Sequence, residues 1–476
     1  MQLILFLLTI LVPLCAGLLM FFLKDRKTQN NLLIGSLALT LAAAIGLACC
    51  GVGTALTIPF GTLSMKFGFD ECGRIFGVLF PAIFLLAGIF STEYMDHDHA
   101  PGRYNGFFLL TMMAMMGLST SQTLLTYYMC YELMTVLSLP LVLHEATDGA
   151  MRAGMKYLGY SLFGASLALF GYFVVGAHIS TEFVPGGTAG LTASPIMLIA
   201  IFCLLIGFGC KAGIMPLHFW LPTAHPVAPA PASAVLSATI TKAGVLGILR
   251  VIYYVVGADI IRHTWVQYVM LILALCTVFS GSMLAYKEKL LKRRFAWSTV
   301  SQVSYVLFGV FLLTNGGIQA GILQVVFHAV CKTALFLTAG AIIHHSGCTY
   351  VSQLNGIGKR MPLLMACYTL ASLSLIGIPP FAGFVSKWQL VTAGMAEFGW
   401  LGIAGGIVLL TSAILTAGYL LPITINGYFK RGEHMTPLHP TWRMLLPMVI
   451  LSGALLLLGL FPMGLTKAAA ALVGLA

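Results

Sequence analysis

Long apolar stretches separated by short polar segments run through the whole chain. Residues 3–23 and 449–461, for example, contain no charged side chain. About 20 apolar residues in a helix cross the hydrocarbon core of a bilayer, and only a helix satisfies its own backbone there over such continuous stretches. The pattern therefore predicts fourteen membrane-spanning helices. Their expected limits are 2–23, 31–50, 74–93, 105–120, 123–144, 153–178, 195–215, 230–256, 264–285, 298–315, 318–343, 362–395, 399–428 and 443–466.

The pattern predicts an all-α membrane protein and disfavours a β-barrel, whose strands alternate apolar and polar residues in segments of about ten. Proline removes a backbone hydrogen bond and bends a helix, and two of the expected helices have prolines where we expect a break. They are the seventh, with Pro216, and the twelfth, with Pro379-Pro380. The twelfth is also too long for one straight span. We expect both helices to be broken.

The composition agrees with a membrane protein and excludes several other classes. Hydrophobic residues make up 59% of the chain and charged residues 8%, whereas soluble domains carry about 25% charged residues. The net charge of +11 does not indicate nucleic-acid binding, because the basic residues are spread between apolar stretches. The 11 cysteines form no CxxC or CxxCH motif, so we expect no metal site and no haem. The N-terminal stretch shows no obvious cleavage site and is interpreted as a first span.

The distribution of Lys and Arg predicts the direction of the helices. Connections after odd-numbered helices carry sixteen of these residues, and the opposite side carries five. The five are Lys66, Arg74, Arg250, Arg262 and Lys467. Cytoplasmic loops are enriched in Lys and Arg. We therefore expect a multi-pass protein of the cell (inner) membrane with both termini on the non-cytoplasmic side.

Four lysines and one carboxylate fall inside expected spans. They are Lys211, Lys242, Lys332, Lys387 and Glu132. A charge at the bilayer centre costs about 2.5–3.5 kcal/mol on insertion scales, so such residues are candidates for ion pathways. Glu132 and Lys211 also have a structural interpretation. The carboxylate is then permanently protonated or held in a fixed ion pair, and Lys211 reaches toward the nearby cytoplasmic end.

Two of these positions favour a proton pathway more strongly. Lys242 lies about twelve residues into its helix, which at about 1.5 Å per residue places it near the midplane. His328 lies four residues before Lys332 on the same helix face, and an imidazole exchanges protons near neutral pH. A hydrogen-bonded core histidine is the alternative. Gln324 extends this face, and the tenth helix adds a softer polar stripe of Ser298, Gln302 and Tyr305.

The two broken helices suggest an internal repeat. They lie five spans apart and so run in opposite directions, and paired broken helices in opposite orientation are typical of inverted repeats with ion sites at the midplane. The predicted repeats are helices 4–8, residues 101–258, and helices 9–13, residues 259–430. Residues 1–100 would form three N-terminal helices, and residues 431–476 the last one.

The chain resembles the antiporter-like subunits of respiratory complex I and their relatives in membrane-bound hydrogenases and Mrp-type Na+/H+ antiporters. The most specific match is residues 211–238, KAGIMPLHFWLPTAHPVAPAPASAVLSA. Further matches lie at residues 69–70, 152–157, 297–305, 328–336 and 377–387. The resemblance covers nearly the whole chain. It implies a medial subunit, because the chain ends soon after the fourteenth helix and lacks the long lateral helix of the largest type.

The resemblance also implies roles for individual residues. Glu132 and Lys211 occupy the places of a glutamate and lysine that pair in this family, and Lys242 that of the mid-channel lysine. In the second half, the family residues of the proton path match His328, Lys332 and Lys387, the last on the exit side. In the resulting hypothesis the Glu132–Lys211 pair closes and opens, and the freed charge drives a proton from Lys242 onward.

These observations leave three functions. The first is a proton-translocating subunit of a complex I-like NADH-quinone oxidoreductase or membrane-bound hydrogenase, and the second a subunit of an Mrp-type antiporter. The third, a stand-alone transporter of a small solute, requires a roomy substrate pocket. The sequence holds no nucleotide loop, iron–sulfur cysteine cluster or haem pair, so we expect no cofactor and no redox step in this chain. Its expected partners are further antiporter-like subunits, a redox arm, lipid and H+, with Na+ as the alternative ion.

Overall fold

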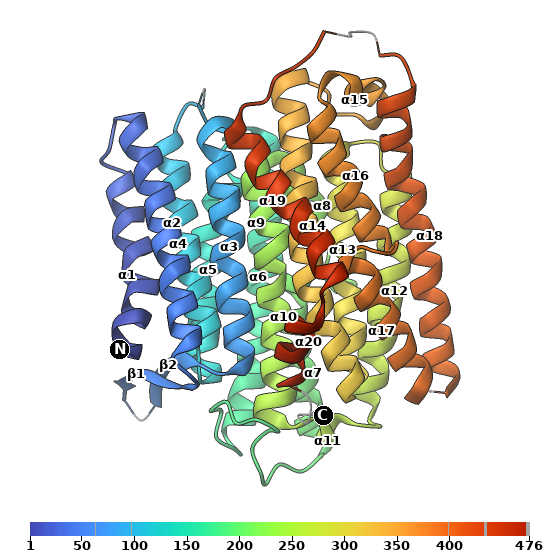
Figure 1. Ribbon diagram of the computed structural model, residues 1–476. Helices are drawn as coiled ribbons and strands as arrows, with labels where there is room; N and C mark the ends of the chain where they lie inside the picture. The colour runs from blue at the N-terminus through green and yellow to red at the C-terminus, as the bar shows by residue number, and fades with distance from the viewer. Residues whose placement is uncertain (62, 97, 398, 433–435, 473–476) are drawn as a thin grey trace.

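The protein is a bundle of membrane-length helices with a small β-hairpin at one end (Figure 1). The computed structural model describes all residues except 62, 97, 398, 433–435 and 473–476. The N-terminal part consists of α1 (Gln2–Met20), α2 (Arg26–Cys49), β1 (Gly53–Phe60), β2 (Leu63–Phe69) and α3 (Glu71–Tyr94). The next part consists of α4 (Pro101–Thr120), α5 (Leu124–Val142), α6 (Asp148–Gly176), α7 (Pro195–Ala212), α8 (Leu221–Val227), α9 (Ala230–Val235), η1 (Leu236–Ile240), α10 (Thr241–Arg250), η2 (Val251–Val256) and α11 (Ala258–Ile261).

The second half of the bundle repeats the same kind of helix. It consists of α12 (Trp265–Lys287), α13 (Leu291–Phe311), α14 (Asn315–Ser346), η3 (Val351–Leu354), α15 (Ile357–Arg360), α16 (Pro362–Ile376), α17 (Ala382–Glu397), α18 (Gly399–Phe429), α19 (Trp442–Leu460) and α20 (Met463–Ala470). Twelve of the fourteen expected spans correspond to one helix each. The eighth corresponds to the continuous segment of α9, η1, α10 and η2, and the twelfth to the broken pair α16–α17. The predicted fold class is confirmed.

Eleven of the described helices are long and apolar enough to cross a membrane. The other three expected spans are α4, the α13 helix with its polar stripe, and the broken α16–α17 pair. Successive long helices run in alternating directions, and the N-terminus and α20 lie at the same end of the bundle (Figure 1). Which end faces the cytoplasm remains a prediction from the basic residues.

Both expected helix breaks are confirmed. The α7 helix ends at Ala212 and is followed by Gly213 with φ of 78°, and α16 ends at Ile376 and is followed by Gly377 with φ of 96°. Glycine adopts this left-handed conformation without the strain that a Cβ would bring. The α7–α8 and α16–α17 segments cross the bundle in opposite directions (Figure 1). Inverted repeats with the predicted boundaries would have this arrangement, and the boundaries themselves remain a prediction.

The helices at the centre of the bundle are the continuous segment 230–256 and α14. The most apolar window of the first is completely buried, and that of α14 is 94% buried. The central segment contains two π-helical stretches, η1 and η2, on either side of α10. Such stretches interrupt the ordinary hydrogen-bond ladder and occur frequently at functional sites. The sequence pattern predicted the helix but not these interruptions.

The β-hairpin is a second feature that the sequence analysis missed. Its strands β1 and β2 are antiparallel, with Gly53 opposite Phe69 and a register shift between Thr54 and Leu56. Residues 54–58 are rich in Thr and β-branched side chains and are followed by Gly61, which is a hairpin signal. The hairpin lies at the end of the bundle where the chain begins (Figure 1).

The predicted position of Arg250 was wrong. It was predicted to belong to a connection, but it is fully buried at the end of α10. Its guanidinium donates two hydrogen bonds to the carboxylate of Asp70, one of them at 2.9 Å, and lies 4.6 Å from the ring centroids of Phe183 and Tyr254. The apolar pattern hid this residue because its partner lies 180 positions away in the sequence.

The tenth expected span also begins earlier than predicted, at Leu291 instead of 298. Lys292 and Arg294 therefore belong to α13, and each is only 9% exposed. More than four basic side chains are thus buried within the helices.

Candidate functional site

The four lysines predicted inside the membrane are all buried in the protein. Lys211, Lys242 and Lys332 have no exposed surface, and Lys387 is 8% exposed. Their side chains point into the helix bundle and make hydrogen bonds there. They come from α7, α10, α14 and α17, so they are spread across both halves of the molecule.

Lys211 is held by aromatic residues at the first helix break. Its Nζ donates a hydrogen bond to Tyr157 Oη at 2.7 Å and lies 4.0 Å from the centroid of the same ring. Tyr157 Oη in turn lies 2.7 Å from Ser138 Oγ. Trp220, just beyond the break, donates to the backbone oxygen of Cys210 at 2.9 Å and satisfies one carbonyl near the end of α7. The break therefore creates an ordered polar pocket for one ammonium group.

Glu132 is not paired with Lys211 in this structure. It is half-buried on α5, and its Oε1 is buried without a hydrogen-bond partner in the part of the chain that the structure describes. Within the same part, no ion pair of 4.0 Å or less joins it to Lys211. The arrangement corresponds to the open form of the pair that the resemblance implied, and the closed form remains a prediction.

Lys242 and His328 are in direct contact at the centre of the bundle. Lys242 Nζ lies 2.7 Å from His328 Nδ1 and 2.8 Å from the backbone oxygen of Ser237. The π-helical stretch explains the second contact. The N–H of Thr241 donates to Leu236 instead of Ser237, so the Ser237 oxygen accepts from two side chains, the Thr241 hydroxyl at 2.6 Å and the lysine.

His328 has a second nitrogen, Nε2, that is buried without a partner among the described residues. An amine and an imidazole at this distance share one hydrogen bond, so a proton on either nitrogen is within one transfer of the other. This contact places two predicted residues of the proton path side by side.

The remaining two lysines bind backbone oxygens, each beside the polar stripe of α13. Lys332 Nζ donates to the backbone oxygen of Phe295 at 3.0 Å and to Ser298 Oγ. Lys387 Nζ donates to the backbone oxygens of Leu375 and Ile376 at 2.6 and 3.2 Å, at the end of α16. The second break therefore supplies the carbonyls that hold its lysine.

The α13 stripe of Ser298, Gln302 and Tyr305 contacts Lys332 and Lys387, and it is linked to α17 through Gln324. Ser298 contacts Lys332, and the Tyr305 ring lies 4.9 Å from Lys387 Nζ. Gln302 Oε1 accepts from Gln324 Nε2 at 3.3 Å, and Gln324 Oε1 accepts from Ser386 Oγ at 2.6 Å. These hydroxyl and amide side chains can hydrogen-bond to water.

Between His328 and Lys387 lies a narrow gap. Besides these two residues it is lined by Gln302, Gln324, Phe327, Cys331, Ser374, Leu375 and Gly383. The gap has no room for a water molecule in this structure. Along the predicted path, proton transfer between His328 and Lys387 through water therefore requires the side chains or α17 to move enough to admit a water molecule.

The sequence analysis missed Tyr157, Ser138, Trp220 and His225. His225 is fully buried and stacks on Phe336, with ring centroids 4.8 Å apart. Neither of its ring nitrogens has a hydrogen-bond partner among the described residues. Tyr157, Trp220 and His225 all lie inside the segments that carry the resemblance, but nothing in the sequence showed which of them faces a lysine.

One group of three residues, away from the buried lysines, has side-chain atoms close enough together to be considered as metal ligands. Ligand atoms of Asp98, His99 and His144 lie within 4.8 Å of one another. His144 Nε2 donates to Asp98 Oδ1 at 2.9 Å, and Arg103 donates to the backbone oxygen of His144 at 2.7 Å. Burial lowers the pKa of His144. Against the opposing effect of burial, hydrogen bonds from Ala100 and His144 lower the pKa of Asp98. We interpret the group as a hydrogen-bonded contact between the α3–α4 connection and the end of α5.

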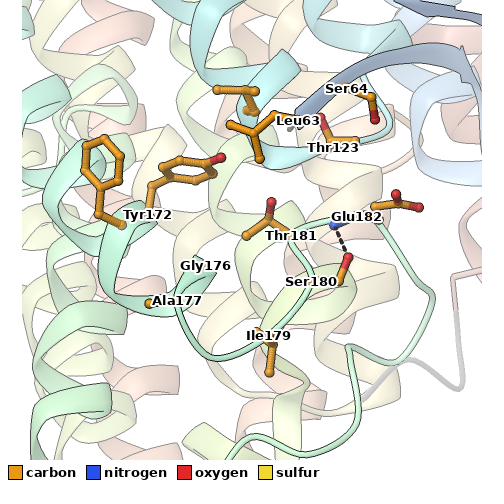
Figure 2. A pocket seen from close by; sticks show the side chains of 12 residues that line it. Leu63, Ser64, Thr123, Tyr172, Gly176, Ala177, Ile179, Ser180, Thr181 and Glu182 are labelled. Atoms are coloured by element: carbon orange, nitrogen blue, oxygen red, sulfur yellow. Dashed lines mark hydrogen bonds between the residues drawn. The ribbon is translucent and has the colours of Figure 1, made fainter. Parts of the chain in front are cut away.

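A further cavity lies apart from the buried lysines. Its volume is about 500 Å³, and Figure 2 shows it between the hairpin end, Thr123 and the segment from Tyr172 to Glu182. None of the six predicted site residues lines it. This cavity is therefore separate from the candidate site formed by the buried lysines.

Comparisons with known proteins agree with this geometry. A family profile described as "NADH:quinone oxidoreductase/Mrp antiporter, TM" matches residues 121–416. A Na(+)/H(+) antiporter subunit of Bacillus subtilis (strain 168) is 30% identical over 476 aligned positions, which cover 95% of this chain and 93% of the relative. An NADH-quinone oxidoreductase subunit of Desulforudis audaxviator (strain MP104C) is 30% identical, and the alignment covers 76% of this chain and 74% of the relative.

Solved structures share the fold. A chain of the Mrp complex from Dietzia sp. DQ12-45-1b superposes with a TM-score of 0.87 at 23% identity, covering 99% of this chain and 97% of the other. A chain of respiratory complex I from Thermus thermophilus superposes with a TM-score of 0.83 at 22% identity, covering 100% and 99%. This chain belongs to the family of antiporter-like membrane subunits of NADH:quinone oxidoreductases and Mrp antiporters.

Proposed function

We propose that this chain translocates protons as a membrane subunit of a complex I-like oxidoreductase or membrane-bound hydrogenase. The observation that carries the proposal is the direct contact of Lys242 with His328, inside a buried row that runs from Lys211 to Lys387. A buried amine beside an imidazole is costly as a purely structural device, whereas it suits a group that gains and loses a proton.

The proposed cycle uses the open and closed forms of the first pair. When Glu132 approaches Lys211, it stabilises a charge on that lysine. When the pair opens, the charge on Lys211 repels a proton on Lys242 toward His328 and Lys387. Moving one charge against about 150 mV costs about 3.5 kcal/mol. An opposite charge within about 4–6 Å shifts a pKa by one to three units, which is about 1.4–4 kcal/mol and of the same size.

The second candidate is a subunit of a multi-subunit Na+/H+ antiporter. The match to the Bacillus subtilis antiporter subunit along 95% of this chain favours it. The lysine row serves either function, because in both a proton crosses through this subunit while partner subunits supply the driving reaction. Both candidates place the chain among other membrane subunits in the cell membrane, with the basic connections on the cytoplasmic side.

Reconstitution of the native assembly tests the proposal and separates the two candidates. We expect the purified complex to contain iron–sulfur centres visible by electron paramagnetic resonance, and to acidify or alkalinise vesicles when its electron donor is added. A complex without such centres that exchanges Na+ for H+ across a pH gradient would instead establish the antiporter function. A purified assembly that moves no protons in either assay would contradict both.

A further inference from the structure

A second polar site lies at the end of the bundle that carries the basic connections. It is a cavity of about 330 Å³ between α6, α8 and the beginning of α13. Three basic side chains line it: Arg152 and Lys156 from α6, and Arg293 from α13. None of them belongs to the proposed proton path, and the four predicted lysines do not line this cavity.

The charge balance of this cavity is strongly positive. Among the described contacts, one carboxylate offsets the three cations: Glu288 Oε2 lies 3.3 Å from Arg293 Nε. Arg293 is 43% exposed, so this pair is weak. Gly149 lines the cavity from the first turn of α6, and Leu290 lines it from the N-cap of α13. The N-terminal ends of two helices thus line the same space as the three cations, although the first turn of α6 also carries the exposed carboxylate of Asp148.

Exposed apolar side chains form a stripe along the outer face of α6, the helix that contributes Arg152 and Lys156 to the cavity. Met155, Phe163 and Phe170 follow one another at helical spacing and are 63%, 54% and 50% exposed. Phe219, near the cavity, is 40% exposed, and Lys156 Nζ lies 5.8 Å from its ring centroid. A basic cavity at the expected headgroup level, continued by an exposed apolar stripe, has the chemistry of a phospholipid with a phosphate at one end and acyl chains at the other.

We propose that this cavity binds the phosphate headgroup of an anionic membrane phospholipid, with an acyl chain along the α6 stripe. Arg152 and Arg293 would bind phosphate oxygens with their planar guanidinium groups, and Lys156 would act as a point charge. The occupant would lie against Pro222, Thr223 and Pro226 of α8, the helix that follows the first break. Lys156 also directly precedes Tyr157, which binds Lys211.

Photocrosslinking in the native assembly tests this proposal. A phosphatidylglycerol carrying a diazirine on its acyl chain is added to the purified complex, and the crosslinked peptides are mapped. We expect crosslinks on α6 between residues 155 and 170. Each basic residue near an anionic headgroup contributes about fivefold, so we expect the Arg152→Gln/Lys156→Gln/Arg293→Gln variant to bind this lipid on the order of 100-fold more weakly. The single variant Lys156→Gln, with a loss of about fivefold, serves if the triple variant does not assemble.

The controls separate a lipid from other occupants. The Lys430→Gln/Arg431→Gln variant removes two basic residues of the same face outside the cavity and should crosslink like the wild type. Phosphatidylcholine should compete poorly, and millimolar inorganic phosphate should not displace the lipid, because it lacks the acyl contacts. Equal competition by inorganic phosphate would overturn the lipid assignment in favour of a free anion. Crosslinking unchanged in the triple variant, as expected if an acidic segment of a partner subunit fills the cavity, would overturn the proposal itself.

Discussion

Replacing Lys242 with arginine will lower proton translocation by the assembled complex to less than about a tenth of the wild-type rate. Arginine keeps the positive charge and the donors that meet Ser237 and His328, but it does not release its proton in proteins. A structural role would tolerate this substitution, whereas a proton carrier would not. The measurement is the initial rate of the pH change in vesicles that contain the purified complex.

Two further variants make this result interpretable. Lys242→Met removes the charge, leaves His328 Nδ1 without its partner, and should be equally inactive. Lys430→Met removes a lysine from an exposed connection and should translocate at the wild-type rate. Subunit composition and thermal stability are compared in each preparation. Lys242→Arg complexes that assemble normally and pump normally would remove Lys242 from the proton path.

The Asp70→Ala substitution will lower the stability of the protein by about 3–5 kcal/mol. It leaves the fully buried guanidinium of Arg250 without its carboxylate, and removing one partner of a buried ion pair has this cost. The same substitution removes the side chain that caps the N-terminus of α3 through the N–H of Gly73. The measurement is the thermal or denaturant midpoint of the purified assembly in detergent.

The matched control is the exposed ion pair of the same end of the bundle. Lys66 and Glu182 are 26% and 49% exposed, so Glu182→Gln should cost less than about 1 kcal/mol. A double variant, Asp70→Leu/Arg250→Met, should recover part of the loss because it leaves no unpaired buried charge. An Asp70→Ala protein as stable as the wild type would show that water or a second partner solvates Arg250.

The sequence predicted the helices well because the bilayer sets their length and excludes charge from them. Its apolar stretches located all fourteen spans, and the prolines near 216 and 379 located both breaks. It also selected four of the buried lysines, since a lysine in the middle of an apolar stretch is easily recognised, but it placed Lys292 in a connection. The sequence could not predict the hydrogen-bond partners of those lysines. Lys242 contacts a histidine 86 positions away, and Lys211 donates to a tyrosine 54 positions away.

Arg250 is a buried charge that the sequence pattern did not identify. It stands near the end of an apolar stretch, where basic residues normally mark a connection, so the pattern assigned it to the surface. Only the fold brings Asp70 from the start of α3 to within hydrogen-bond distance. The π-helical stretches on either side of α10 are equally invisible in the sequence, because their residues are ordinary helix and strand formers. The first of them removes the backbone donor of the Ser237 oxygen, which instead accepts from the side chains of Thr241 and Lys242.

A high-resolution cryo-electron microscopy map of the assembled complex tests the central claim most directly. The claim is that the buried amines and imidazole form one proton-conducting row across the bundle. We expect ordered water between Lys211 and Lys242, and between His328 and Lys387, in at least one conformational state, with the Lys242–His328 contact preserved. Dry gaps at both places in every state, or any of these side chains turned toward lipid, would contradict it.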